Sequence, residues 1–214
     1  ITDARSNLLD SLRFASHPRA HGTVIVFGGK VIAGTRAKKE FSKSYNAFSS
    51  INYPDIAVIH DDRIVFYIDD KEQSTKRLRF YHAMDDRIFL LKLIPSIDPL
   101  VLENLADSYD GLILESFGVG GLPDYGNHDF AAMIEKWTSA GKLVTMSTQV
   151  THEGSDMGIY KVGKVIKENF EILESYDMTL EATVTKMMWI LAQTRDFEEC
   201  KKLFYTTVNK DILF

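Results

Sequence analysis

A glycine-rich turn that follows a short apolar run is the stretch of the sequence best suited to bind a small anion. The apolar run is residues 112–114, and the turn contains Gly118, Gly120, Gly121 and Pro123. The uniform hydrophobicity predicts a strand buried on both faces, and parallel strands of this kind end where ligands bind. Backbone N–H groups of the glycines could approach an anion or a neighbouring subunit. A turn that needs glycine geometry without any ligand is the alternative interpretation.

Other chemistries find little support in the sequence. A dinucleotide fingerprint would need a third glycine where Pro123 stands. Ser116 lacks the glycine two residues earlier that a nucleophile elbow requires, which favours a structural serine. The six histidines are scattered, and the single cysteine, Cys200, is expected to be a packing residue. We therefore predict no metal site.

A second candidate for chemistry is the charged segment 35–40, which contains Lys38 and Lys39. A lysine that follows a sheet strand can reach an active-site cavity, where burial lowers its pKa and favours proton transfer. Solvated surface charge is the simpler interpretation, because most lysines are exposed. The residue types alone leave both interpretations open.

The composition describes a globular chain with a sizeable core. It has 214 residues, of which 45% are hydrophobic and 26% charged, with a net charge of −5 and a pI near 5.7. The acidic balance and the lack of a long basic run argue against a nucleic-acid partner. No apolar run approaches the roughly 20 residues that span a bilayer, and the first residues do not resemble a signal peptide. Because the sequence begins without methionine, we expect a processed piece or a fragment.

The first third of the sequence predicts a helix followed by two β-hairpins. Apolar residues recur at helical spacing over residues 3–15, with Thr2 or Asp3 as the N-cap. The predicted strands are 23–27 and 30–33 around Gly28-Gly29, and 56–59 and 63–67 around Asp61-Asp62, the second hairpin lying at a sheet edge. The charged segment 34–44 is expected to leave the sheet as a loop.

A change in composition separates this part from a regular alternation of strands and helices. Residues 73–86 hold few aliphatic side chains and predict a linker. Beyond it a βαβαβ pattern predicts strands 88–94, 112–114 and 143–147 with helices 99–106, capped by Asp98, and 129–139. The rest is predicted to be helical, at 158–169, 179–194 and 197–206. The fold class is therefore α/β, with a helix and β-hairpins of a mixed sheet followed by a parallel-sheet α/β domain.

Seven motifs, taken in order, resemble the bacterial and archaeal L-asparaginase family. They are Asp3-Ala-Arg-Ser-Asn-Leu, Gly34-Thr-Arg-Ala-Lys-Lys, Phe48-Ser-Ser-Ile-Asn-Tyr-Pro, Gly118-Val-Gly-Gly-Leu-Pro, Ser147-Thr-Gln-Val, Tyr160-Lys-Val-Gly and Asp177-Met-Thr-Leu-Glu-Ala-Thr-Val-Thr-Lys. They extend over essentially the whole chain. The resemblance implies that residues 1–72 are the C-terminal part of the family's N-terminal domain, residues 73–86 the linker, and residues 87–214 the family's smaller, C-terminal α/β domain.

The resemblance also implies which part of the catalytic group this chain holds. The family's two motifs that carry threonine nucleophiles, Thr-Gly-Gly-Thr and His-Gly-Thr-Asp-Thr, are absent from the sequence. Spacing to Phe48 places the family's catalytic lysine at Lys39, with Lys38 as the neighbouring alternative. The loop of Gly118, Gly120, Gly121 and Pro123 becomes a candidate active-site or intersubunit element. Where the secreted branch has an asparagine after the glycines, this chain has Leu122-Pro123.

By this resemblance, the complete protein is a cytoplasmic homodimer or homotetramer. It hydrolyses the side-chain amide of L-asparagine to aspartate and ammonia without a cofactor, using a threonine outside this chain, and it has no membrane or nucleic-acid partner. The 214 residues alone are expected to be inactive. Two alternatives stay open: a non-catalytic assembly or ligand-binding module of the same fold, and the asparaginase-like subunit of a tRNA-dependent amidotransferase. The preference between asparagine and glutamine also stays open.

Overall fold

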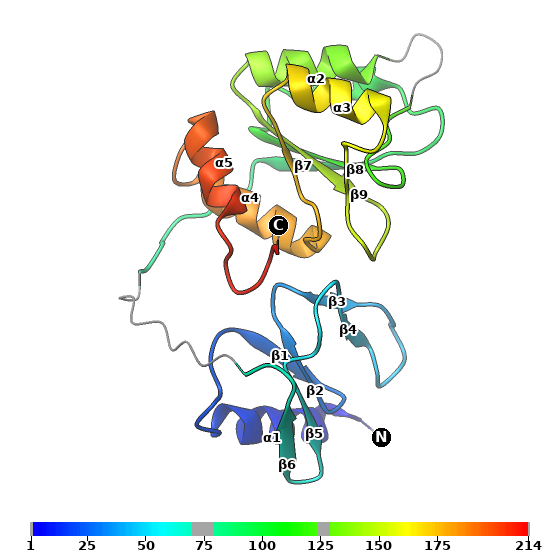
Figure 1. Ribbon diagram of the computed structural model, residues 1–214. Helices are drawn as coiled ribbons and strands as arrows, with labels where there is room; N and C mark the ends of the chain where they lie inside the picture. The colour runs from blue at the N-terminus through cyan, green and yellow to red at the C-terminus, as the bar shows by residue number, and fades with distance from the viewer. Residues whose placement is uncertain (1, 70–78, 124–128, 214) are drawn as a thin grey trace. The chain divides into compact units, whose positions relative to one another are not determined.

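The computed structural model describes residues 2–69, 79–123 and 129–213, which form two compact units (Figure 1). The first unit runs to Tyr81 and also includes Val208–Asp211 from near the end of the chain. The second unit contains His82–Thr207 and the last residues from Ile212. Residues 73–78 of the predicted linker lie outside the described residues.

The first unit combines one helix with two antiparallel sheets. Helix α1 (Ala4–Ala15) packs on a four-stranded sheet of order β1-β2-β5-β6. The strands of this sheet are β1 (Val24–Phe27), β2 (Lys30–Ala33), β5 (Ala57–His60) and β6 (Arg63–Phe66). A separate two-stranded ladder pairs β3 (Ala37–Lys39) with β4 (Phe48–Ser50). The predicted helix and both predicted hairpins are therefore confirmed.

The first hairpin owes its geometry to Gly28 and Gly29. Their φ angles are +58° and +75°, the pair of positive values that a two-residue type I′ turn requires. The turn sets the register in which Phe27 lies opposite Lys30. In the second hairpin, Asp61 takes the positive φ, at +55°. At the start of α1 the Thr2 hydroxyl, rather than Asp3, accepts a hydrogen bond from the Ala4 N–H at 3.2 Å.

The prediction that residues 34–44 form a loop is wrong for their central part. Ala37–Lys39 form β3, whose residues pair in antiparallel register with those of β4. The pairing continues past β3, since Glu40 N donates to the Ala47 carbonyl at 2.8 Å. The charged composition concealed this strand because backbone hydrogen bonds to β4, rather than the β propensity of its own residues, hold it in place.

The second unit is built around a parallel sheet of order β10-β9-β8-β7. Its strands are β7 (Ile88–Lys92), β8 (Gly111–Ser116), β9 (Leu143–Thr148) and β10 (Ile172–Glu174). Its helices are the 3-10 helix η1 (Pro99–Leu102) and the α-helices α2 (Phe130–Ser139), α3 (Lys161–Asn169), α4 (Leu180–Leu191) and α5 (Phe197–Tyr205). Helices α2 and α3 cover one face of the sheet, and α4 and α5 cover the other (Figure 1).

Two hydrophobic clusters bury both faces of the central strand β8. Leu112 and Leu114 belong to the cluster under α2, whereas Ile113 belongs to the cluster under α4 and α5. All six residues of β8 are buried. On α2, Trp137 is fully buried and its Nε1–H donates to the Leu102 carbonyl at 3.1 Å. The prediction of a doubly covered strand is confirmed, as is the α/β fold class.

Two details of the predicted second unit are wrong. The helix expected over 99–106 is a 3-10 helix that ends at Leu102, although Asp98 does cap it by accepting from the Leu100 N–H at 2.9 Å. The region after 158 was expected to be wholly helical, but β10 lies within it as the fourth strand. A three-residue strand beside Glu171 gives too short an apolar run to be recognised, and its place is decided by pairing with β9.

Candidate functional site

The two candidate lysines lie next to each other on β3. Lys39 is opposite Phe48 and Lys38 is opposite Ser49. The Lys39 side chain is exposed, and its Nζ lies 5.9 Å from the centroid of the Phe48 ring. Because successive residues of a strand face opposite sides, Lys38 and Lys39 point away from each other. Only one of them can therefore reach a ligand on a given side of the ladder.

A fully buried arginine anchors the strand that carries these lysines. Arg36 has no exposed surface, and its Nε donates to the Lys210 carbonyl at 2.5 Å. Its guanidinium carbon lies 5.8 Å from the centroid of the Tyr53 ring. Its own carbonyl accepts from the Ile51 N–H at 2.8 Å, which extends the ladder beyond β3. Both the side chain and the backbone carbonyl of Arg36 therefore hold the beginning of β3 in place.

The segment Val208–Asp211 completes this anchor. The Thr35 hydroxyl donates to the Asn209 carbonyl at 2.6 Å, and Asn209 Nδ2 donates to the Thr23 carbonyl at 2.9 Å. The residues around position 210 thus hold the residues just before β3. The sequence offered no signal for these contacts, since they join residues 174 and 186 positions apart.

In the second unit, the glycine-rich turn is closed by its own backbone. Gly120 N and Gly121 N both donate to the Phe117 carbonyl, at 3.1 and 2.7 Å. Gly118 and Gly120 have φ angles of +51° and +132°, and Pro123 is buried. Two of the amides that might have met an anion therefore already have a partner inside the turn. The structure favours the interpretation that the glycines serve backbone geometry.

We predict that Gly120→Asn destabilises the second unit and that Gly118→Asn does not. A φ of +132° lies beyond the left-handed range that asparagine tolerates, and a Cβ at Gly120 would lie 3.0 Å from Met157 Cγ. A strained residue of this kind costs on the order of 1–3 kcal/mol. At Gly118 the φ of +51° suits asparagine, and a Cβ would meet nothing within 4 Å. Urea unfolding of both variants measures the difference, and equal losses would contradict the prediction.

The polar side chains at the carboxyl end of the sheet are engaged with the neighbouring backbone. The Thr148 hydroxyl donates to the Gly118 carbonyl, and Gln149 Nε2 donates to the Leu93 and Glu115 carbonyls at 2.6 and 3.0 Å. A further hydrogen bond joins the Ser116 hydroxyl to the Ser147 carbonyl at 2.5 Å. Ser116 is buried, as the structural interpretation requires. The Ser116, Thr148 and Gln149 side chains are therefore held by backbone carbonyls, and the contacts of these described residues do not include a base that would activate a nucleophile.

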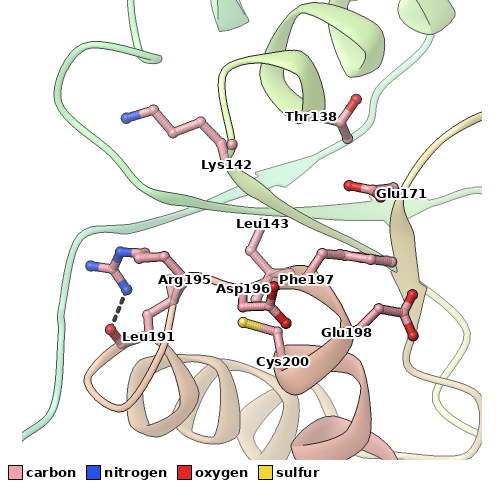
Figure 2. Close-up of a pocket in the computed structure, with 11 residues that line it drawn as sticks. Thr138, Lys142, Leu143, Glu171, Leu191, Arg195, Asp196, Phe197, Glu198 and Cys200 are labelled. Carbon is pink, nitrogen blue, oxygen red and sulfur yellow. Dashed lines mark hydrogen bonds between the residues drawn. The ribbon is translucent and has the colours of Figure 1, made fainter.

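A pocket of about 260 Å³ lies at the opposite, amino end of the strands, beside Leu143 at the start of β9 (Figure 2). Charged and apolar side chains from the loop before β9, from α5 and from the turn before α5 line it. Cys200 lines it as well, but the residue is buried and its Sγ donates to the Thr194 carbonyl at 3.7 Å. Burial raises the pKa of the Cys200 thiol, so this cysteine is a packing residue, as predicted, and not a nucleophile.

Beside this pocket, two carboxylates bind three cations. Asp110 forms ion pairs with Lys142 at 2.8 Å and with Arg87 at 2.5 Å, and Arg195 bridges Asp110 and Asp85 at 3.2 and 2.5 Å. The hydrogen bond from Lys142 lowers the pKa of Asp110, and the hydrogen bond from Arg87 lowers the pKa of Asp85. These pairs join the segment before β7 to the starts of β8 and β9. Their geometry is that of a structural clamp.

The clamp predicts a loss of stability in acid. Because the carboxyl pKa values are lower in the folded chain, the unfolded chain takes up protons first as the pH falls. The contribution of these ion pairs to the free energy of unfolding should therefore be fully present above about pH 4, the pKa of an aspartate in the unfolded chain. It should decline as the pH falls below that value. Asp110→Asn should cost about 1–2 kcal/mol at pH 7 and flatten the decline.

Urea unfolding at pH 7 and pH 3, followed by tryptophan fluorescence, measures this effect. Both tryptophans of the sequence, Trp137 and Trp189, lie in the second unit, so the signal reports on that unit. The control is Asp62→Asn, an exposed turn residue of the first unit. An unchanged acid decline in Asp110→Asn would contradict the role of the clamp.

A wider, open pocket of about 650 Å³ lies between α3, β10 and α5. Lys167 lines this pocket, and its Nζ donates at 2.6 Å to the carboxylate of Glu174, a buried residue that also accepts from the Met157 N–H at 2.7 Å. Burial lowers the pKa of Lys167, but hydrogen bonds to Glu174 and Tyr176 outweigh that effect and raise it overall. Burial raises the pKa of Tyr205 to about 12. Neither lysine nor tyrosine is poised for proton transfer near neutral pH.

The part of the chain that the structure describes contains neither a metal-binding cluster nor a membrane-spanning helix. No group of three or more His, Cys, Asp or Glu residues within 2–69, 79–123 and 129–213 is arranged to hold a metal ion. None of the helices in those ranges is long and apolar enough to cross a membrane.

Comparison with known proteins shows which family has this architecture. The family model described as Glutaminase/Asparaginase C-terminal domain matches residues 87–204, and the model described as Asparaginase, N-terminal matches residues 1–72. The L-asparaginase of Thermococcus kodakarensis is 36% identical over 211 residues, which are 99% of this chain and 63% of that protein. A Glutamyl-tRNA(Gln) amidotransferase subunit of Pyrococcus abyssi is 27% identical over 99% of this chain and 49% of that protein.

Solved structures agree with these matches. The thermostable L-asparaginase from Thermococcus kodakarensis superimposes with a TM-score of 0.92 at 35% identity, over 99% of this chain and 63% of that one. L-asparaginase I from Vibrio cholerae has the same fold, with a TM-score of 0.87 at 24% identity, over 99% of this chain and 64% of that one.

The hairpins of the first unit and the four-stranded parallel sheet of the second define an α/β protein of the asparaginase fold. The chain belongs to the glutaminase/asparaginase family, since the family's C-terminal domain model covers more than half of it. It spans about half to two thirds of the length of the curated relatives that it matches.

Proposed function

We propose that this chain is the larger part of an L-asparaginase, which hydrolyses the side-chain amide of asparagine to aspartate and ammonia. The observation that carries the proposal is 36% identity to the Thermococcus kodakarensis L-asparaginase over 99% of this chain. The nucleophilic threonine would come from outside the 214 residues, because neither threonine motif of the family occurs in the sequence. The chain alone is therefore expected to be inactive.

Lys39 would supply the cation of the catalytic group. Its ammonium group, held beside a threonine and an aspartate, would favour loss of the threonine proton. The threonine oxygen would attack the amide carbon, and backbone N–H groups would stabilise the oxyanion. The proton lost by the threonine would pass to the amide nitrogen, which would leave as ammonia. Water would then hydrolyse the acyl-enzyme to aspartate and restore the threonine hydroxyl. The exposed position of Lys39 on an anchored strand supports this role, and none of these steps requires a cofactor.

The turn of Gly118, Gly120, Gly121 and Pro123 would have an intersubunit role in a homodimer or homotetramer. Its closed backbone gives it a defined shape that a neighbouring subunit could contact, whereas direct binding of substrate by its amides finds less support.

We further propose a cytoplasmic location. A neighbour of the same fold, with a TM-score of 0.77 at 16% identity, is the probable cytoplasmic L-asparaginase from Campylobacter jejuni.

The second candidate function is that of the amidotransferase subunit. Its support is the 27% identity to the amidotransferase subunit of Pyrococcus abyssi over 99% of this chain. Against it stand the lower identity and the net charge of −5, which does not favour binding of tRNA. A non-catalytic module of the same fold is the third candidate, supported by the absent threonine motifs.

The experiment compares the chain alone with the chain combined with the part of the Thermococcus kodakarensis relative that has no counterpart here. Ammonia release is measured with asparagine and with glutamine. We expect release from asparagine only in the combined sample. A combined sample that assembles but releases no ammonia would overturn the proposal in favour of the non-catalytic module. Tight binding of tRNA would favour the amidotransferase function.

A further inference from the structure

Phe48 is the residue directly opposite Lys39 in the ladder of β3 and β4. Along an antiparallel ladder, hydrogen-bonded pairs alternate with pairs that are not hydrogen-bonded. The next pair along is hydrogen-bonded, since Glu40 N donates to the Ala47 carbonyl at 2.8 Å. Lys39 and Phe48 therefore form a pair that is not hydrogen-bonded, the kind in which the two side chains lie closest together.

The Phe48 ring is also within reach of the Lys39 ammonium group. Nζ lies 5.9 Å from the ring centroid, inside the distance of about 6 Å over which an aromatic ring attracts a cation. Lys39 is exposed, and its four-carbon stem is flexible. An exposed ammonium group without such a neighbour would occupy many positions, so the ring favours one placement of the charge.

Phe27, at the end of β1, holds the Phe48 ring from the four-stranded sheet. The centroids of the two rings are 5.1 Å apart and their planes meet at 60°, an edge-to-face arrangement that aromatic pairs prefer. Both residues are half-buried. Phe27 is itself fixed by its pairing with Lys30 in the first hairpin. Phe48 therefore links Lys39 to a strand of the larger sheet.

The turn that follows Phe27 lies directly against the loop between β3 and β4. A Cβ at Gly28 would lie 3.1 Å from the carbonyl oxygen of Tyr45 in that loop. The Gly28 N–H donates to Asn7 Oδ1 at 2.9 Å, which fixes the turn to helix α1. The first hairpin and the β3–β4 loop are therefore packed closely together, and the rings of Phe27 and Phe48 meet where they join.

We propose that Phe48 is a positioning residue for the reaction. Its ring, held by Phe27, keeps the Lys39 ammonium group in one place on the ladder, ready for the threonine that lies outside this chain. The inference rests on the proposed function and deepens it, since it names what orients the cation of that site. Phe48 acts through Lys39 and touches no reacting atom. A catalytic group that is already in place loses little freedom in the transition state, which raises kcat.

A packing role alone would have different consequences. Loss of a half-buried ring lowers the free energy of unfolding whatever the function of the residue. A residue that only packs would leave the kcat of the folded enzyme unchanged. A residue that acts through Lys39 lowers kcat, and its loss has no further effect once the ammonium group is absent. A double-mutant cycle with Lys39 separates the two roles.

The experiment uses the chain combined with the part of the Thermococcus kodakarensis relative that has no counterpart here. Values of kcat and KM for asparagine are measured below the melting temperature of every variant. The variants are Phe48→Leu, Phe48→Tyr, Lys39→Met, and Phe48→Leu together with Lys39→Met. Phe66→Leu is the matched control, since Phe66 is a half-buried aromatic residue of β6 whose ring lies 5.8 Å from that of Phe14.

We expect Phe48→Leu to lower kcat by at least about 10-fold with little change in KM, because small displacements of a catalytic group cost up to about 100-fold. Phe48→Tyr keeps the ring and should retain nearly normal kcat. In the Lys39→Met background, Phe48→Leu should cause no further loss. Phe66→Leu should lower the melting temperature and leave kcat unchanged. A normal kcat in Phe48→Leu, or an equal loss with and without the lysine, would assign Phe48 to packing and overturn the inference.

A measurement without turnover separates this inference from the proposed function. In the isotope-labelled 214-residue chain, we expect a nuclear Overhauser effect between the Lys39 side chain and the Phe48 ring, and a weaker one in Phe27→Leu. Its absence would refute the positioning role and leave the function intact. A wild-type assembly that shows this effect but releases no ammonia would refute the function and leave the contact intact.

Discussion

In the assembled enzyme, Lys39→Met is expected to lower kcat for asparagine by about 100-fold or more, the usual scale for a positioned acid–base group. Methionine keeps the length and the apolar stem of the side chain but removes the ammonium group. Lys39 is exposed and its side-chain contact is with Phe48, 5.9 Å from the ring centroid, so the fold loses little by the change. The kcat for asparagine and a melting curve of the same variant are the measurements.

Lys38→Met is the matched control for this prediction. Lys38 precedes Lys39 on β3, lies opposite Ser49, and points to the other side of the ladder. It should retain nearly normal kcat. A normal kcat in Lys39→Met with a lost kcat in Lys38→Met would shift the catalytic register by one residue. Normal values in both variants would remove the lysine from the mechanism.

The parts of the fold that the sequence predicted are those decided by local features. Two consecutive glycines with positive φ produce the first hairpin, and a run of buried aliphatic residues produces β8. Asp98 and Asp129 cap η1 and α2 through their own side chains. In each case the residues that determine the element lie within it or beside it, so a sequence pattern is sufficient.

The parts that could not be predicted depend on partners far away in the chain. Strand β3 exists because β4 pairs with it, and β10 exists because β9 does. Each has only three residues. No periodicity develops over such a length, and tertiary pairing decides the structure.

The candidate site shows the same division. The family resemblance, with the spacing to Phe48, pointed to Lys39 and left Lys38 as the neighbouring alternative. The catalytic role of the lysine stays a prediction. Burial of Arg36, by contrast, depends on a backbone carbonyl 174 residues further along the chain. For the glycine-rich turn, the sequence left an anion site and a purely structural turn open. The hydrogen bonds from Gly120 and Gly121 to Phe117 favour the structural turn.

The second prediction with a large expected effect concerns Arg36. Arg36→Ala should lower the free energy of unfolding of the first unit by about 3 kcal/mol or more, since it removes a large buried side chain and leaves a carbonyl without its donor. The side chain is fully buried, and its Nε bond to the Lys210 carbonyl is 2.5 Å long. Arg63→Ala on the exposed end of β6 is the matched control, with an expected change within about 0.5 kcal/mol.

Hydrogen exchange at the Ile51 amide gives a local measure of this effect, because that N–H donates to the Arg36 carbonyl at 2.8 Å. Loss of the anchor should speed its exchange, whereas Arg63→Ala should leave it unchanged. In the assembled enzyme, Arg36→Ala should also lower kcat at temperatures where the protein is still folded, because β3 would no longer hold Lys39 in one position. A variant with slow Ile51 exchange and normal kcat would show that the ladder of β3 and β4 holds Lys39 without the buried arginine.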